Sequence, residues 1–391
     1  MQRIYVDNAA TTRVSKPILK LAGDVMESMF YNPSSIYREA HEAKAKIEES
    51  RMILADILGA KSEEIFFTSG GTESDNWAIK GLAIQHEGGH IITSMVEHHA
   101  VLHVCQELEK KGYSVTYLPV DEMGMIDLQD LEKAIREDTF LITIMFANNE
   151  IGTIQPIEEI GRLARKNNIV FHTDAVQAFG KIRIDVNKLS IDMLSLSAHK
   201  IHGLKGSGAL FIRKGIRIQP LLHGGGQEKK KRSGTENIVG IVTMGETAKL
   251  SYQDLEEKNN TIMMMRDYLI DEVLKTIPYA RLNGDATRRL AGNVNFSFEF
   301  IEGESLLMLL EKEGILASSG SACTSGSLDP SHVLLAIGLP HEKAHGSLRI
   351  SLDYEENTLE QMDHLIRVLP GIVEKLRDLS PLYEDFINGG A

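Results

Sequence analysis

The sequence predicts an α/β protein in which a mostly parallel, seven-stranded sheet forms a large domain and a smaller α+β domain follows it. Between Ser62 and Lys214, short β-rich runs alternate with stretches of helical periodicity. This alternation is typical of a sheet that carries helices on both faces. The chain has 391 residues, of which 42% are hydrophobic, so it can bury a large core in more than one domain.

The predicted elements follow one another in a regular order. The strand candidates are EIFFTS, HIITSM, SVTYLPV, FLITIMFA, IVFHTDA, MLSLSA and ALFIRK, and helical stretches such as IEEIGRLARKNN separate most of them. A glycine-rich loop, HGGGQEKKKRSGTEN, comes next, and a long helical stretch then runs from about Ile238 to Thr276. The runs NVNFSFEF, ILASSG and SLRISL and a final helix predict the smaller domain. We therefore place the large domain at residues 14–260 and the small domain at residues 1–13 and 261–391.

The bulk composition argues against several classes of protein. The formal net charge of -13 disfavours a nucleic-acid partner. No apolar run approaches the roughly 20 residues that a membrane-spanning helix needs, and the N-terminal residues MQRIYVDNAA lack the pattern of a signal peptide. The chain has two cysteines, Cys105 and Cys323, which is too few for a disulfide framework. We therefore expect a cytoplasmic protein.

Lys200 is a candidate catalytic residue because it follows a hydrophobic strand in the run MLSLSAHKIHG. Ligands of open α/β sheets bind beyond the carboxyl ends of strands. A lysine there can be partly desolvated, which lowers its pKa and frees the amine to form a Schiff base. Ser197 and His199 flank it and could hold a phosphate. Taken alone, the run favours a solvated lysine at the end of a strand.

Other strand ends carry groups that complement this lysine. Asp174 ends the strand IVFHTDA, and a carboxylate there could keep a pyridine nitrogen protonated, while Gln177 could donate to a ring oxygen. The run FFTSGGTESDN leads from a strand into a helix, so the backbone amides of Gly71 and Thr72 could cradle a phosphate, although a plain helix cap would look similar.

Two further strand ends complete the set. His98, in TSMVEHHAV, offers a flat ring that could stack on a cofactor, and MFANNEIG presents Asn149. None of the five strand ends is specific by itself. Together they carry the groups that a pyridoxal 5′-phosphate (PLP) site requires.

Nine motifs in this chain resemble those of the NifS/IscS-type cysteine desulfurases, which are fold type I PLP enzymes of aminotransferase class V. The motifs are DNAATT, YNPSS, TSGGTESDN, EHHAV, ANNEIGTIQP, HTDAVQAFGK, SAHKIHGLKG, RSGTEN and SSGSACTSGSLDPSHV. They cover nearly the whole chain in the expected order. The resemblance therefore implies an activity as well as a fold.

The resemblance also implies a role for each candidate residue. It implies that Lys200 forms the Schiff base, that His98 lies over the ring and that Cys323 accepts the sulfur, which makes these three the catalytic residues. The implied cofactor-binding residues are Gly71, Thr72, His98, Asn149, Asp174, Gln177, Ser197, His199, Lys200 and Thr235. Thr235 would reach the phosphate of a neighbouring subunit, so the resemblance implies a homodimer. Asn149 and Arg349 would hold the substrate carboxylate, and no metal is expected.

The two cysteines lie in different settings. Cys105 lies on an apolar helical face in AVLHVCQEL, where a free cysteine acts as a small buried hydrophobe. Cys323 lies among glycine, serine and threonine, which are typical of a mobile loop. A loop of this kind suits a thiolate that must reach a substrate sulfur and then leave with it.

The implied activity is the PLP-dependent removal of sulfur from L-cysteine, which gives L-alanine and a persulfide on Cys323. The sulfur would pass to an iron–sulfur scaffold or to a tRNA-thiolation protein. The alternatives are a selenocysteine lyase or another fold type I PLP enzyme, and an assembly partner without catalytic activity. Cys323 argues against a transaminase, and the presence of Lys200 and Asp174 argues against an inactive partner.

Several other signals are weaker. HEKAH, at residues 341–345, matches a zinc-protease string, but Pro340 and Gly346 leave little room for a long ligand helix. The basic run at residues 229–232 fits a solvated loop or a subunit rim.

Four positions depart from the usual pattern of the family. Leu204 stands where proline is common, Tyr31 where glycine is common, and Asp353 and Tyr354 where glycine or serine and then arginine are usual. None of these departures removes a chemical group that the reaction needs.

Overall fold

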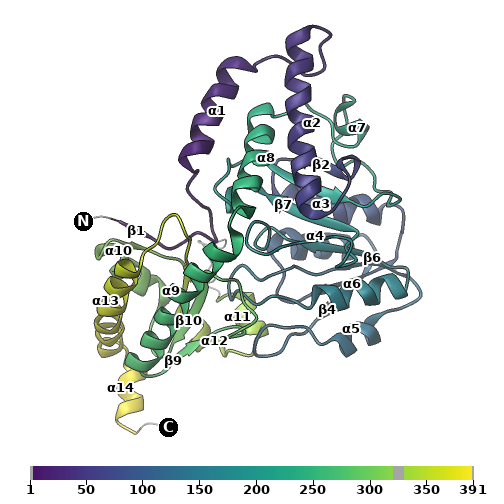
Figure 1. The fold of residues 1–391 in the computed structure, drawn as a ribbon. Helices are drawn as coiled ribbons and strands as arrows, with labels where there is room; N and C mark the ends of the chain where they lie inside the picture. The colour runs from purple at the N-terminus through teal and green to yellow at the C-terminus, as the bar shows by residue number, and fades with distance from the viewer. Residues whose placement is uncertain (1–2, 320–329, 390–391) are drawn as a thin grey trace.

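The computed structural model describes residues 3–319 and 330–389, and its main layer is a seven-stranded sheet (Figure 1). The strand order is β2-β8-β7-β6-β5-β3-β4. The strands are β2 (Ile65–Thr68), β3 (His90–Ser94), β4 (Ser114–Leu118), β5 (Thr139–Thr143), β6 (Val170–Asp174), β7 (Met193–Ser197) and β8 (Gly208–Ile212). Each of the predicted β-rich runs of the large domain therefore contributes one strand, and the α/β prediction is confirmed.

The direction of the strands places the functional strand ends at one edge of the sheet. Strands β4, β3, β5, β6 and β7 pair in parallel. Strand β8 runs antiparallel to both β7 and β2, so β2 points the same way as β7. The carboxyl ends of β2, β3, β5, β6 and β7 consequently meet at the same edge, where an open α/β sheet binds its ligands.

Helices cover both faces of the sheet because its side chains alternate between two hydrophobic cores. In β8, Phe211 belongs to one core and its neighbour Leu210 to the other. The first core packs against α2 (Arg38–Leu58), α5 (Leu128–Ala134), α6 (Ile157–Lys166) and α8 (Ile238–Tyr252). The second packs against α3 (Gly71–Ala83) and α4 (His99–Glu109). Helix α1 (Lys16–Ser28) contacts α8, and α7 (Gln227–Lys230) is a short turn in the glycine-rich loop.

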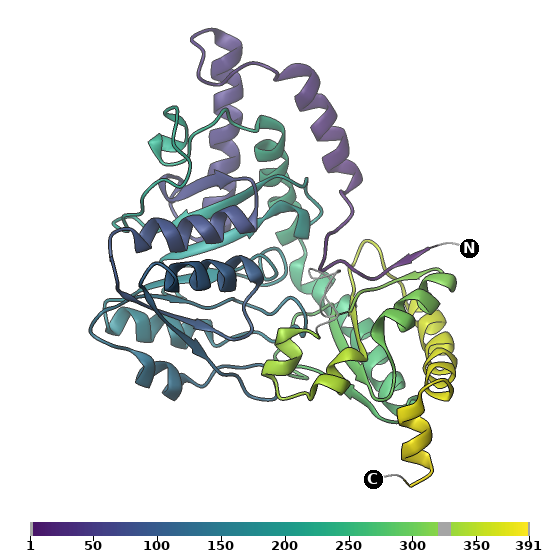
Figure 2. The same cartoon turned by 180° about the vertical axis from the view of Figure 1, so that it is seen from behind.

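The C-terminal part of the chain builds a second, smaller layer around an antiparallel sheet of order β12-β10-β9. Its elements are α9 (Leu255–Thr276), β9 (Ala280–Leu282), β10 (Asn293–Phe298), α10 (Gly303–Lys312), β11 (Ile315–Leu316), α11 (His332–Ala336), α12 (His341–His345), β12 (Ser347–Ser351), α13 (Leu359–Asp378) and α14 (Pro381–Ile387). Strand β1 (Ile4–Tyr5) pairs with β11, so β1 lies beside the small layer (Figure 2). No helix in the described part of the chain is both long and apolar enough to cross a membrane.

The long helical stretch predicted between residues 238 and 276 is two helices, so this part of the prediction needs a correction. Gln253 is extended and Asp254 adopts a left-handed conformation with φ 52°, which separates α8 from α9. Apolar periodicity continues on both sides of the break, so the pattern alone could not reveal it. The buried side chains of α8 join the core of the large sheet, whereas those of α9 join the core of the small one. This separation supports a domain boundary near residue 260, which we retain as a proposal.

Candidate active site

Lys200 lies at the carboxyl edge of the sheet, in a short helical turn at Ala198–Lys200 that directly follows β7. Its Nζ donates to the backbone carbonyls of Ala9 and Ala10, each at 2.7 Å. The N-terminal segment therefore crosses the sheet edge and contacts the lysine. The side chain is only partly exposed.

Asp174 ends β6, the strand next to β7, and its carboxyl group is buried. The backbone N–H of Val176 donates to Asp174 Oδ1 at 2.9 Å, which fixes the carboxylate. Burial raises the pKa of Asp174, and the charge of Lys200 opposes this rise. A cationic partner would stabilise the ionised form further, which is what a protonated pyridine nitrogen supplies.

A second buried carboxyl group, Asp75, lies behind Asp174 and was not predicted as a site residue. Burial and then the charge of Asp174 hold the pKa of Asp75 well above its ordinary value, which favours the neutral form of Asp75. Asp75 Oδ1 lies 3.7 Å from Nε2 of His172, whose pKa burial lowers to about 3. His172 is therefore neutral, and Ser195 and Thr143 hold its two ring nitrogens at 3.0 and 2.8 Å.

The start of α3 forms the anion-binding end of the site. Gly71 is the first residue of this helix, and an added Cβ there would lie 2.6 Å from Val176 Cγ2, so the helix start approaches the Asp174 loop closely. Gly70 has a φ of 152°, and a Cβ on it would lie 3.8 Å from Ser197 Oγ. Thr72 is exposed in the first turn. Backbone N–H groups at a helix start favour a negatively charged ligand.

Ser197 provides the test of whether a phosphate fits this end. Its Oγ is buried and has no hydrogen-bond partner among residues 3–319 and 330–389. A buried hydroxyl without a partner is costly, and a phosphate oxygen at the start of α3 would satisfy it. Together with the buried carboxylate of Asp174 and the amine of Lys200, this hydroxyl makes the residues at the sheet edge a good fit for PLP.

His199 and His98 flank this edge as neutral rings. Burial and then the charge of Lys200 lower the pKa of each histidine to about 4. His98 Nδ1 accepts from the backbone N–H of Ala100 at 3.1 Å, which caps α4 and leaves the proton on Nε2. His199 Nδ1 lies 3.1 Å from Thr11 Oγ1, so this ring contacts the N-terminal segment. A neutral, fixed His98 ring suits the stacking role predicted for it.

Arg349 and Asn149, which the family resemblance implies as the residues that hold the substrate carboxylate, meet at the boundary between the two layers. Arg349 lies on β12 and its side chain is 4% exposed. Nη1 donates to the Asn149 carbonyl at 3.2 Å, and Nη2 donates to Asp7 Oδ1 at 2.8 Å. Nε has no partner among the described residues. The guanidinium thus keeps its Nε–H as a donor for a substrate carboxylate. Asp7 is a partner of Arg349 that the sequence analysis did not identify.

Thr235 lies in a loop beside the start of α3. Thr235 is exposed in the loop that follows Arg232, whose guanidinium holds Glu73 of α3 at 2.8 and 3.0 Å. Cys323 lies outside the described residues. Of the residues that flank its segment, Ser318 pairs with Arg349 through backbone hydrogen bonds, and Ser331 Oγ donates to Glu150, the residue after Asn149.

Comparisons with known proteins agree with this geometry. A family model described as aminotransferase class-V matches residues 4–365. The cysteine desulfurase IscS of Methanosarcina thermophila is 58% identical to this chain, over 97% of the chain and 94% of its own length.

Solved structures of similar proteins share the fold. A structure described as a NifS-like protein has a TM-score of 0.90 and 40% identity, and the match covers 96% of this chain and 100% of that one. A structure described as "SspA in complex with cysteine" has a TM-score of 0.79 and 42% identity, and the match covers 90% of this chain and 99% of that one.

Proposed function

This chain belongs to the aminotransferase class-V family and is a PLP-dependent cysteine desulfurase, and from this premise we propose that Lys200 and Cys323 carry its chemistry. One observation carries the assignment of Lys200: its amine and the buried carboxylate of Asp174 lie at the ends of adjacent strands. They are close enough for the lysine charge to oppose the rise that burial causes in the pKa of Asp174. PLP, when bound, supplies an electron sink that takes up the electrons released when the substrate loses its α-proton.

The substrate carboxylate is held by Arg349 and Asn149 in this proposal. The free Nε of Arg349, and the Nη2 that now contacts Asp7, can together form a two-point contact with a carboxylate. The buried position of the guanidinium excludes water from this contact and fixes the α-carbon in front of Lys200.

Lys200 then acts as the proton-transferring base. Its Nζ is held by two backbone carbonyls, which orient it without removing its ability to accept a proton once it is neutral. The neutral ring of His98 adds no positive charge that would compete for the substrate carboxylate. Ser197, His199, Gly71 and Thr72 would hold the phosphate, Gln177 the ring oxygen and Asp174 the ring nitrogen.

Cys323 removes the sulfur. Its thiolate attacks the sulfur of the bound cysteine, so an S–S bond forms while the substrate C–S bond breaks. The electron pair of the broken bond stays on the carbon, which takes up a proton and becomes the methyl group of alanine. The sulfur remains on Cys323 as a persulfide. The contacts that Ser318 and Ser331 make near Arg349 support this role, because they anchor both ends of the Cys323 segment beside the substrate.

Arg349→Lys tests the substrate assignment. A lysine cannot reproduce the planar two-point contact, so the KM for L-cysteine is expected to rise by about tenfold or more while the absorption spectrum of the bound cofactor stays unchanged. The measurement is alanine formation from L-cysteine over a range of substrate concentrations.

Arg377→Lys is a matched control for this experiment. Arg377 is also a buried arginine of the small layer, but its side chain donates to the carbonyls of Glu299 and Pro278. This variant should lose stability without a change in KM. An unchanged KM in Arg349→Lys would show that the carboxylate is bound elsewhere.

We also propose that the enzyme is a homodimer in which Thr235 completes the site of the partner. The exposure of Thr235 supports this, because an exposed side chain is available to a neighbouring subunit. If the Thr235 hydroxyl reaches the phosphate of the partner across the interface, a single chain lacks one of the groups that its own site needs.

Co-expression of two defective chains can test this arrangement. Thr235→Val should load PLP poorly at limiting cofactor, and Lys200→Ala should not turn over. In a mixed dimer, a trans-acting Thr235 gives one complete site, so activity should return to about half of the wild-type value per dimer. If Thr235 acts within its own chain, the mixed dimer stays inactive. Thr235→Ser, which keeps the hydroxyl, should load PLP normally.

Two broader proposals concern the cellular context. We propose that the persulfide sulfur passes to an iron–sulfur scaffold or to a tRNA-thiolation protein, because a persulfide needs a thiol acceptor to turn over. We also propose a cytoplasmic location, which the two cysteines and the need for a reduced Cys323 support.

A further inference from the structure

Lys181 lies directly behind Gln177, on the wall of a cavity of about 400 Å³ between the two layers. Its Nζ donates to Gln177 Oε1 at 3.3 Å. The other end of the amide is also held, because Gln177 Nε2 donates to the Ala9 carbonyl at 2.9 Å. That carbonyl is one of the two that receive Lys200 Nζ, so a continuous chain of hydrogen bonds links Lys181 to Lys200.

These contacts decide which way the Gln177 amide points. An ammonium group has only donors and a backbone carbonyl has only acceptors. A flipped amide would set its NH2 against Lys181 and its oxygen against the Ala9 carbonyl, and both contacts would be repulsive. The observed orientation leaves Nε2 with a second N–H, because a side-chain amide nitrogen has two and Ala9 takes one.

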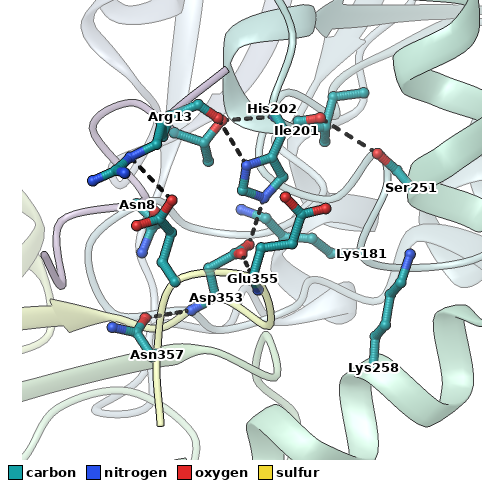
Figure 3. Close-up of polar contacts among 12 residues, drawn as sticks. Asn8, Arg13, Lys181, Ile201, His202, Ser251, Lys258, Asp353, Glu355 and Asn357 are labelled. Carbon is teal, nitrogen blue, oxygen red and sulfur yellow. Dashed lines mark hydrogen bonds and ion pairs between the residues drawn. The ribbon is translucent and has the colours of Figure 1, made fainter. Parts of the chain in front are cut away.

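The charge of Lys181 is maintained by its surroundings. Burial lowers the pKa of Lys181 to about 8, and Asp353 opposes this shift while Arg349 adds to it. Asp353 also accepts from His202 Nε2 at 2.8 Å, so the group that faces Lys181 is itself an ion-paired carboxylate (Figure 3). At neutral pH, Lys181 is therefore mostly protonated and remains a donor to Gln177.

We propose that Lys181 is a positioning residue that fixes the Gln177 amide so that its second N–H points at the ring oxygen of PLP. The proposal rests on the assignment of Gln177 to that oxygen. The N–H stabilises the negatively charged form of the ring oxygen. In the PLP-loaded protein, this oxygen shares a proton with the nitrogen that links the cofactor to the lysine, so the N–H favours loss of that proton. Without Lys181, only the Ala9 carbonyl still opposes a turn of the amide that would set its own oxygen toward the ring oxygen, so this stabilisation is weakened.

A pH titration of the visible absorption of the PLP-loaded protein tests this role without measuring turnover. Lys181→Met removes the donor, and Gln177→Ala removes the amide. Each should move the midpoint of the spectral transition to higher pH by roughly 1 to 2 units, as expected for loss of one hydrogen bond to a charged group. In the double variant, Lys181→Met should add almost nothing to the shift of Gln177→Ala, because one residue acts through the other.

Lys181→Gln distinguishes an effect on the orientation of the Gln177 amide from an effect of the Lys181 charge. It also provides the test if Lys181→Met does not fold. It keeps a side-chain N–H donor but has no charge. A midpoint near that of the wild type supports the positioning role, and a midpoint shifted as far as in Lys181→Met overturns it. Lys258→Met is the control, since Lys258 lines the same cavity but donates to the Leu250 carbonyl, and its titration should be unchanged.

The remaining outcomes are distinguishable. Full additivity in the double variant would show that Lys181 acts by its charge alone, which overturns the proposal. A wild-type titration for Lys181→Met, beside a shifted one for Gln177→Ala, overturns it as well and leaves the cofactor site intact. A wild-type titration for Gln177→Ala would remove Gln177 from the ring oxygen, so the assignment on which the inference rests would fall with it.

Discussion

Lys200→Ala is expected to reduce alanine formation from L-cysteine by about 10³-fold or more, because it removes both the covalent link to PLP and the base that takes the α-proton. The variant should still bind PLP, since the start of α3, Ser197 and Asp174 remain in place. The yellow colour of the wild type should bleach with borohydride, and the reduced cofactor should then be found on the peptide that contains Lys200.

Lys258→Ala is the matched control for this loss. Both lysines line the same cavity, but Lys258 Nζ donates to the Leu250 carbonyl at 2.9 Å. Its removal should leave turnover and colour unchanged. Substantial turnover in Lys200→Ala, or cofactor fixed by borohydride on another lysine, would show that Lys200 is not the PLP lysine.

Cys323→Ser is expected to lower sulfide release by about 10³-fold or more while the protein keeps its colour and still binds L-cysteine. A serine hydroxyl is a far weaker nucleophile than a thiolate at neutral pH, and it cannot store sulfur as a persulfide. Mass spectrometry of the wild type after a short pulse of cysteine should find an increment of about 32 Da per sulfur atom on the Cys323 peptide, and thiols should remove it.

Cys105→Ser is the control, and the structure explains why this cysteine is inert. Cys105 is fully buried in α4, and burial raises the pKa of its thiol far above neutral. The serine variant should keep its activity and lose roughly 1 kcal/mol of stability through burial of a hydroxyl group. Sulfur found on Cys105, or full sulfide release from Cys323→Ser, would contradict the assignment and leave the PLP site untouched.

Much of the site was predictable because its residues follow strands. The alternation of β-rich and helical runs predicted a mostly parallel sheet, and parallel strands bring their carboxyl ends to one edge. Asp174, Ser197 and Lys200 could therefore be grouped from the sequence, and the structure brings them together at adjacent strands. The motifs that resemble the cysteine desulfurases then predicted their roles.

The contacts that refine the site could not be predicted in this way. Asp7 pairs with Arg349, which lies 342 residues away in the sequence. The Ala9 carbonyl accepts from Gln177 and from Lys200, which lie 168 and 191 residues away. The sequence analysis did not single out Asp75, and only the fold buries it near Asp174.

The sequence alone therefore determined the fold class, the carboxyl edge as the location of the site, and the residue types that its chemistry needs. It could do so because these features depend on local periodicity and on strand direction. Only the tertiary structure decided how each side chain is oriented and charged: the amide of Gln177 by Lys181 and Ala9, and the guanidinium of Arg349 by Asp7. These orientations and pKa shifts depend on burial and on partners from distant segments, which meet only when the two layers pack together.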